Sequence, residues 1–203
     1  SYGSYLAQVY ATLHPDRLSR VVMDGVIDPR FDWYDANLRQ GPAFEKVVKK
    51  FFTWVAKRNR TYRLGATQAA VYRTYRKLQA RVTVRPGGGK IGPAEVADAV
   101  LPAGYHAGWW SSVAEGLSRA WTSRDYSWLE WLYGGPGDDN LHAVYLAVQC
   151  TDSPWPRGWQ TWEQDNRALH RKAPFLAWAN AWFNMPCRTW SEPAGTPVTI
   201  DGS

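Results

Sequence analysis

Large apolar residues recur at spacings of three and four positions through most of the chain, a pattern typical of amphipathic helices. The clearest stretch runs from Pro42 to Lys57, where six apolar side chains share one face. The same pattern predicts helices over residues 5–13, 66–81, 93–101, 109–121, 126–133, 158–171 and 173–183. Residues 143–150 are mostly apolar, and their pattern fits a strand or a helix.

One short segment has a different pattern. Residues 20–25 form a β-branched run that ends at Gly25, which suits a buried strand of a parallel sheet. A helix followed by such a strand is half of a crossover unit, so the sequence predicts an α/β class. We expect residues 1–28 and 141–203 to be parts of the α/β core, and residues 29–140 to form a helical cap inserted after the strand.

Composition narrows the class of protein only slightly. The chain has 203 residues, 45% of them hydrophobic, and a net charge of +6, which suits a domain with a buried core and admits an acidic partner. No segment approaches the roughly 18 uninterrupted apolar residues that a membrane-spanning helix needs. Two cysteines, Cys150 and Cys187, fit either one disulfide or two buried thiols.

The first three residues, Ser1-Tyr2-Gly3, stand at the head of a predicted helix. They match the second half of a nucleophile elbow, the turn that exposes a serine between a strand and a helix. In such a turn the backbone N–H of the next residue, here Tyr2, points at the developing oxyanion. A serine two residues before a glycine is common, and an ordinary helix N-cap is the alternative interpretation of Ser1.

Longer segments around this motif give it more weight, because they resemble actinobacterial tripeptidyl aminopeptidases and related prolyl-aminopeptidase-like hydrolases. The resemblance covers nearly the whole chain, densely at both ends and loosely between them. The matching segments are SYGSYL (residues 1–6), HPDRL (14–18), VVMDGVIDP (21–29), AVQCTD (147–152), PW (154–155), APF (173–175), NAWF (180–183) and PCRTW (186–190).

The resemblance implies an α/β-hydrolase-fold serine peptidase in which Ser1 is the nucleophile. Its Asp and His partners would follow beyond the end of this sequence, so the chain is expected to be an internal piece and inactive alone. It further implies a disulfide between Cys150 and Cys187, no cofactor, and a protein that is secreted or associated with the cell wall. Val55 and Tyr62 stand where many relatives carry a second cysteine pair, which leaves the cap held by packing.

An aminopeptidase must also bind the free ammonium group of its substrate, and a partly desolvated carboxylate is the simplest device for this. The candidates are Asp152, in the Cys-x-Asp pattern of the family, then Asp138 and Asp139, with Glu130 behind them. Acidic turns in water are the alternative for the last three. Tryptophans at 109, 110, 128 and 131 are candidates for walls of a peptide cleft or for packing.

The expected function is therefore hydrolysis through a Ser1 acyl-enzyme that releases tripeptides or other short peptides from a free N-terminus, in a monomer without nucleic-acid partners or a membrane span. Two alternatives remain: an esterase or other small-acyl hydrolase on the same fold, and a basic, aromatic-rich module that binds nucleic acid or another anionic polymer. No cluster has metal-ligand spacing, and Gly87-Gly88-Gly89 lacks the context of a phosphate-binding loop. A triad completed within the chain by Asp152 and His170 is disfavoured, because the residues around His170 have the pattern of a solvated helix face.

Overall fold

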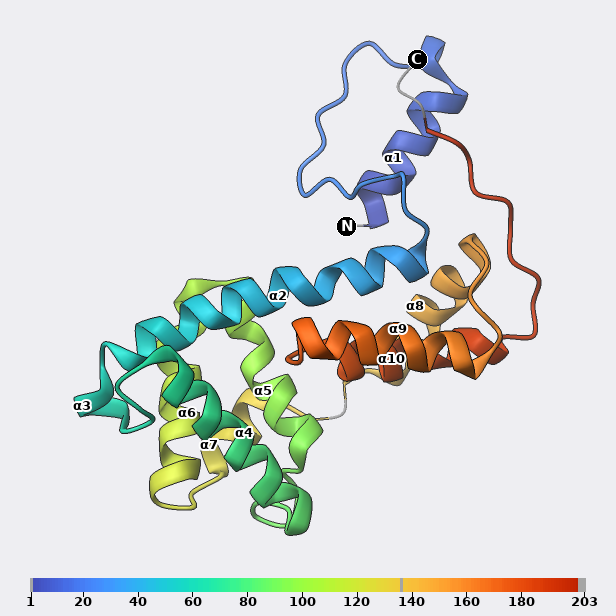
Figure 1. The fold of residues 1–203 in the computed structure, drawn as a ribbon. Coiled ribbons are helices and arrows are strands. Elements are labelled where there is room, and N and C mark those ends of the chain that lie inside the picture. The colour runs from blue at the N-terminus through green and yellow to red at the C-terminus, as the bar shows by residue number, and fades with distance from the viewer. Residues whose placement is uncertain (1, 136, 201–203) are drawn as a thin grey trace.

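A long helix, α2 (Trp33–Ala56), runs through the middle of the computed structural model, which describes residues 2–135 and 137–200 (Figure 1). The Asp32 side chain caps its first turn by accepting a hydrogen bond of 2.9 Å from the Asp35 backbone N–H. The helix therefore begins nine residues before Pro42, which lies inside it and not at its first turn as the sequence predicted. Pro42 removes one backbone donor from the helical hydrogen-bond pattern, and the helix continues past it to Ala56.

The other helices agree with the predicted ones to within a few residues. The segment whose pattern was ambiguous, residues 143–150, lies within α8. The bounds are α1 (Tyr2–Leu13), α3 (Asn59–Tyr62), α4 (Gln68–Val84), α5 (Pro93–Tyr105), α6 (Trp110–Thr122), α7 (Ser127–Tyr133), α8 (Asp139–Asp152), α9 (Trp159–Lys172) and α10 (Ala177–Asn184), with short 3₁₀ turns η1 (Pro15–Arg17), η2 (Ala107–Trp109) and η3 (Met185–Thr189).

The strand predicted over residues 20–25 does not form. Within the described residues the only β pairing is an isolated bridge between Gly87 and Ile91. Val21 and Val22 are 44% and 97% exposed instead of buried. A parallel strand is stable only between neighbours that satisfy its backbone groups and cover its side chains, and the described part of the chain offers it none. The helical part of an α/β architecture is therefore what this structure contains.

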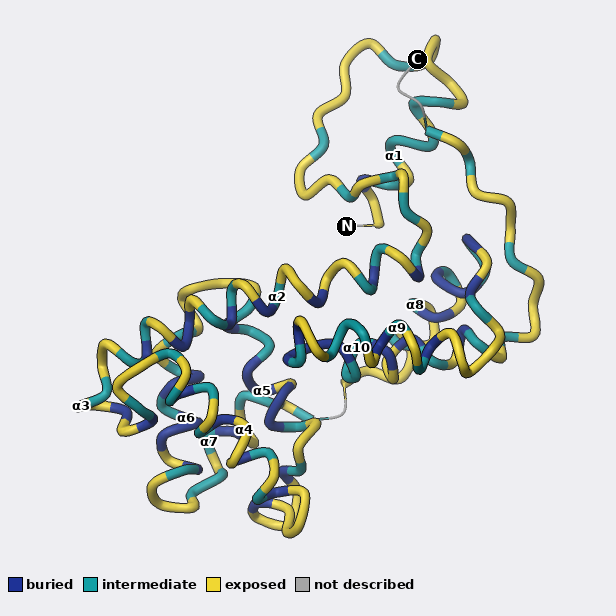
Figure 2. The backbone as a smooth tube through the Cα atoms, viewed as in Figure 1, coloured by how far each residue is buried: buried dark blue, intermediate teal, exposed yellow. Residues whose placement is uncertain are grey.

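The larger hydrophobic core lies where the second half of α2 meets α4, α5, α6 and α7 (Figure 2). Val48, Phe51, Phe52 and Val55 of α2 are fully buried there, as the three- and four-residue spacing predicted. Val55 and Tyr62, the positions at which relatives were expected to carry cysteines, are both members of this core. Packing of large side chains thus holds this part of the molecule together.

A second, smaller core joins the first half of α2 to α8, α9 and α10. Tyr34 of α2 packs against Trp155 and Trp162 with ring centroids 5.9 and 4.9 Å apart. The expected disulfide between Cys150 and Cys187 is confirmed, and it links α8 to η3. None of the described helices combines the length and the apolar character that a membrane crossing requires.

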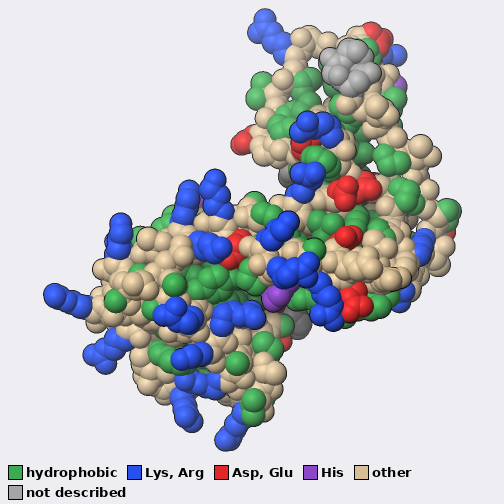
Figure 3. Space-filling view, viewed as in Figure 1, with side chains coloured by type: hydrophobic (Ala, Val, Ile, Leu, Met, Phe, Trp, Pro, Cys, Tyr) green, Lys and Arg blue, Asp and Glu red, His purple; other side chains and the backbone are tan. Residues whose placement is uncertain are grey.

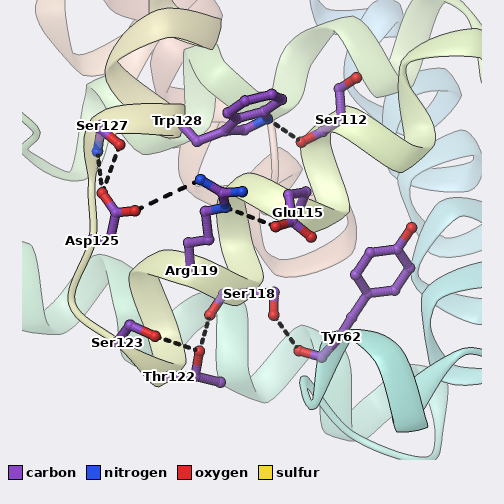
Figure 4. A network of polar contacts seen from close by, with 10 residues as sticks. All are labelled: Tyr62, Ser112, Glu115, Ser118, Arg119, Thr122, Ser123, Asp125, Ser127 and Trp128. Carbon is purple, nitrogen blue, oxygen red and sulfur yellow. Dashed lines mark hydrogen bonds and ion pairs between the residues drawn. The ribbon is translucent and has the colours of Figure 1, made fainter.

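Polar contacts fix the corner between α6 and α7 (Figure 4). The Arg119 side chain donates to Glu115 Oε1 at 2.7 Å and lies 3.9 Å from Asp125, which in turn accepts a hydrogen bond of 3.0 Å from the Ser127 backbone N–H. The Trp128 indole N–H donates to the backbone oxygen of Ser112 at 2.9 Å. These contacts provide hydrogen-bond partners for polar groups between the end of α6 and the start of α7, a short helix.

The carboxylate of Glu45 ties α2 to two neighbouring segments. Glu45 is only 3% exposed, and its Oε2 accepts hydrogen bonds from the Tyr72 hydroxyl at 3.0 Å and from the Phe175 backbone N–H at 3.1 Å. Its Oε1 lies 3.2 Å from Lys49 Nζ. Burial, followed by the charge of Glu45, raises the pKa of Tyr72 well above its usual range. Through these contacts the buried carboxylate of Glu45 orients α4, and the segment just before α10, relative to α2.

Replacement of this carboxylate is expected to destabilise the protein. Glu45→Ala leaves one buried donor, the Phe175 backbone N–H, and one partly buried donor, the Tyr72 hydroxyl, unpaired. It should lower the free energy of unfolding by about 3 kcal/mol, measured by denaturant titration of the full-length protein. Lys49→Ala is the control and should cost less than about 1 kcal/mol, because the Lys49 side chain is 42% exposed. Equal costs for the two variants would contradict this role of Glu45.

The disulfide closes a loop with a sequence separation of 37 residues. Removing it with the double change Cys150→Ser and Cys187→Ser should therefore lower the free energy of unfolding by about 3–4 kcal/mol through loop-closure entropy. Reduction of the wild-type protein should produce a similar loss. A native protein in which both thiols react with a thiol reagent before unfolding would show that the bond is absent.

Candidate active site at the start of α1

The candidate elbow lies at the first turn of α1, which begins at Tyr2; Ser1 lies outside the described residues. Three hydrogen bonds hold this turn against the segment that follows α1. The Ser4 hydroxyl donates to the backbone oxygen of Gly25 and accepts from the backbone N–H of Ile27, both at 3.3 Å. The side-chain amide of Gln8 donates to the backbone oxygen of Ile27 at 3.3 Å. Residues 25–27 thus reach the start of α1 although they form no strand.

Aromatic packing places the start of α2 beside the start of α1. The Trp33 ring stacks on Tyr2 with centroids 6.0 Å apart and meets Tyr5 edge to face at 5.2 Å. The backbone N–H of Trp33 donates to the hydroxyl of Ser153 at 3.4 Å, which adds the end of α8 to the same junction. Three segments distant in the sequence therefore meet next to the candidate nucleophile.

Asp152 is the one predicted substrate-binding carboxylate that the structure brings to this junction. It is the last residue of α8, and its Oδ2 is buried without a hydrogen-bond partner among the described residues. Burial raises the pKa of the Tyr2 hydroxyl, and the nearby carboxylate of Asp152 raises it further. Burial and the charge of Asp152 likewise raise the pKa of Tyr5.

The other three predicted carboxylates lie elsewhere. Asp138 caps α8 by accepting a hydrogen bond of 3.0 Å from the Leu141 backbone N–H, and Asp139 is exposed in the first turn of that helix. Glu130 forms an ion pair with Lys90 on the surface of α7. Figure 1 shows α7 well away from α1. Local structure explains the positions of Asp138 and Glu130 without a ligand.

A cleft of about 920 Å³ opens from Tyr2 along one face of α2. It adjoins a pocket of about 320 Å³, since Asn37, Gln40, Tyr105 and Tyr145 line both. The tryptophan in the cleft wall is Trp33, and none of those at 109, 110, 128 and 131 lines it. Residues lining the larger cleft are Tyr2, Val26, Ile27, Asp28, Phe31, Trp33, Ala36, Asn37, Arg39, Gln40, Ala43, Phe44, Tyr105, Tyr145 and Gln149.

Two carboxylates line this continuous cleft, and their surroundings differ. Asp28 accepts hydrogen bonds from the Arg30 side chain, which lower its pKa to about 2. Asp98, on the wall of the smaller pocket, has neither a hydrogen bond nor an ion pair within the described part of the chain. Burial, followed by the charge of Glu95, raises the pKa of Asp98. Asp98 and Trp33 could not be predicted from the sequence, because an acid in an amphipathic helix and an aromatic residue after a loop carry no distinctive pattern.

Basic residues cover much of the lobe formed by α2 to α7 (Figure 3). Two of them stack on tryptophan rings: Arg58 lies 4.0 Å from the Trp54 ring centroid, and Arg81 lies 4.5 Å from that of Trp121. The alternation of basic and aromatic residues thus reflects packing within the chain at these positions. In the described residues no three His, Cys, Asp or Glu side chains are placed to share a metal ion.

Comparison with curated proteins finds two similar tripeptidyl aminopeptidases. Those of Streptomyces lividans and Streptomyces coelicolor are each 42% identical over 209 residues, which covers 98% of this chain and 39% of the relative. Serine protease Hip1 of Mycobacterium bovis is 25% identical over 95% of this chain and 41% of its own length. The chain therefore spans about two fifths of the length of these relatives.

The family model described as "alpha/beta hydrolase fold" matches residues 1–179. This match covers the candidate elbow, α2 and most of the second hydrophobic core. It agrees with the resemblance that the sequence segments indicated, and the predicted helices are present although the strand is not. The chain belongs to the alpha/beta hydrolase fold family.

Proposed function

We propose that this chain is part of a serine exopeptidase that releases tripeptides from a free N-terminus, with Ser1 as the nucleophile. The observation that carries the proposal is the position of Tyr2, the residue after Ser1, at the mouth of a long cleft along α2. A cleft beside a nucleophile elbow is where this fold class binds its substrate. The names of the similar Streptomyces proteins support the choice of a tripeptidyl activity.

In the proposed mechanism the Ser1 hydroxyl attacks the carbonyl carbon of the scissile bond, while a histidine outside these 203 residues accepts its proton. The backbone N–H of Tyr2, at the positive end of α1, donates to the oxygen that becomes negative. The histidine returns the proton to the leaving amine, and water then hydrolyses the acyl-enzyme. An aspartate outside the chain orients the histidine.

The exposed apolar side chains of α1 and of residues 21–26 fit this proposal. Leu6, Leu13 and Val22 are 54%, 56% and 97% exposed, which is costly for a helix and a β-branched segment of an isolated domain. In the proposed protein residues 1–28 and 141–203 are parts of the α/β core, which covers these side chains, and residues 29–140 form the cap. The disulfide supports the further proposal that the protein is secreted or associated with the cell wall.

The test uses the full-length protein and a fluorophosphonate probe that labels activated serines. Peptide mapping should locate the label on Ser1, and Ser1→Ala should abolish both labelling and release of the chromophore from Ala-Ala-Pro-p-nitroanilide. The wild-type protein should refuse the N-acetylated form of the same substrate, because an exopeptidase needs the free ammonium group.

Two other outcomes would each contradict a different part of this proposal. A labelled Ser1 together with hydrolysis of simple esters and of neither peptide would indicate an esterase on the same fold. Absence of label on Ser1 would mean that the elbow assignment is wrong.

A further inference from the structure

We propose that Asp98 binds the N-terminal ammonium group of the substrate and thereby sets the length of the released peptide at three residues. This inference rests on the proposed exopeptidase function. It concerns the pocket that adjoins the cleft, which is not lined by Tyr2 or by any of the carboxylates predicted from the sequence.

Asp98 is placed to meet a ligand and not a neighbouring side chain. It shares one face of α5 with Leu101 and Tyr105, at spacings of three and four residues, and all three line the pocket that continues the cleft. Asp98 is an exposed residue on the wall of the pocket, and the protein around its carboxyl still raises the pKa of that group. A carboxylate in such a position gains most from a cation that arrives with the substrate, because no cation of the described chain pairs with it.

Two other acids near the cleft, Asp28 and Asp32, are engaged by groups of the chain itself. Asp28 is bound by the Arg30 side chain, with Arg30 Nε 2.8 Å from its Oδ1. Asp32 caps α2 through its own Oδ1. Asp152 lies against Tyr2, at the nucleophile end of the cleft, where an ammonium group would belong to a substrate residue close to the scissile bond. Asp98 remains as the carboxylate at a distance from the candidate nucleophile.

The distance along α2 from the residue beside Tyr2 to the Asp98 pocket can be compared with the length of a tripeptide. Trp33, Asn37 and Gln40 lie on the same face of the helix and all line the cleft. Trp33 stacks on Tyr2, whereas Asn37 and Gln40 reach the pocket that contains Asp98. From Trp33 to Gln40 the helix rises by about 10 Å, at about 1.5 Å per residue. Three residues of extended peptide also span about 10 Å, so a substrate attached at Ser1 would bring its third residue to the Asp98 pocket.

The polar groups between the two ends suit an extended peptide backbone. Asn37, Gln40 and Tyr145 line both the cleft and the pocket. Asn180 donates a hydrogen bond of 2.9 Å to the backbone oxygen of Asn37, and the Tyr145 hydroxyl donates one of 2.7 Å to Asn184. The side-chain amide of Asn37 donates to the backbone oxygen of Trp33 at 2.8 Å and accepts from that of Gln40 at 3.2 Å. These contacts fix the positions of the side chains that line the cleft and the pocket.

The experiment compares Asp98→Asn with wild type in the full-length protein, on Ala-Ala-Pro-p-nitroanilide with a free and with an acetylated N-terminus. Asp98→Asn should lower kcat/KM for the free-amine substrate by about 10- to 100-fold, mainly through KM, because one charge-assisted contact is lost. The rate of fluorophosphonate labelling at Ser1 should not change. Asp98→Glu should keep much of the preference for the free amine. Glu163→Gln removes a half-buried charge that pairs with Arg167 on α9, away from the cleft, and should stay within about twofold of wild type.

Several results would overturn the inference. Wild type that releases tripeptides, together with an unaffected Asp98→Asn, refutes the role of Asp98 and leaves the proposed function standing. A loss of free-amine preference in Asp152→Asn instead would move the ammonium site next to the nucleophile. Equal losses of activity and labelling in both Asp98 variants would mean that the residue is structural. Wild type that hydrolyses no free-amine peptide overturns the exopeptidase function and this inference together.

Discussion

The buried carboxylate of Glu45 is the contact on which the arrangement around α2 depends. A charge that is 3% exposed must find its partners inside the protein, and the available ones come from α4 and from the segment before α10. Those hydrogen bonds therefore fix where both segments lie on α2. Because α2 is also a wall of the cleft, the same contact positions the surface that the substrate would follow.

The two halves of α2 have different structural roles. Val48, Phe51 and Phe52 bury the second half of the helix in the larger core, which makes the helix rigid. Trp33, Asn37 and Gln40 line the cleft on its first half. A rigid helix that is packed at one end and lines a cleft at the other holds its polar groups at fixed distances from Tyr2. In the proposed exopeptidase, positioning of this kind would select substrates by length.

Most of the helices could be predicted from the sequence, because each has apolar residues at a spacing that matches the helical turn. The strand over residues 20–25 could not be judged in this way: its pattern is that of a buried strand, but burial requires neighbours that the described residues do not supply. The start of α2 was missed by nine residues because Pro42 suggested a first turn, whereas the cap is formed by Asp32. Local patterns thus predict elements well and their tertiary partners poorly.

The candidate site was predictable only near the motif. Ser1 and Tyr2 follow from a short pattern and a family resemblance, and Cys150 and Cys187 from the same resemblance. Asp152 was predicted as a carboxylate of the family pattern, and its contact with Tyr2 emerges only from the fold. Asp98 has no sequence signal, since an acid on a helix is usually solvated; its significance depends on the pocket built by α2, α5, α8 and α10.

The central claim is that the cleft holds three substrate residues between the nucleophile and Asp98. Its most direct test is a crystal structure of the full-length Ser1→Ala protein with an uncleaved peptide that has a free N-terminus. The account predicts the scissile carbonyl at the start of α1, the peptide extended along Trp33, Asn37 and Gln40, and the ammonium group within hydrogen-bonding distance of Asp98. An ammonium group bound at Asp152, or a peptide that avoids this face of α2, would contradict it.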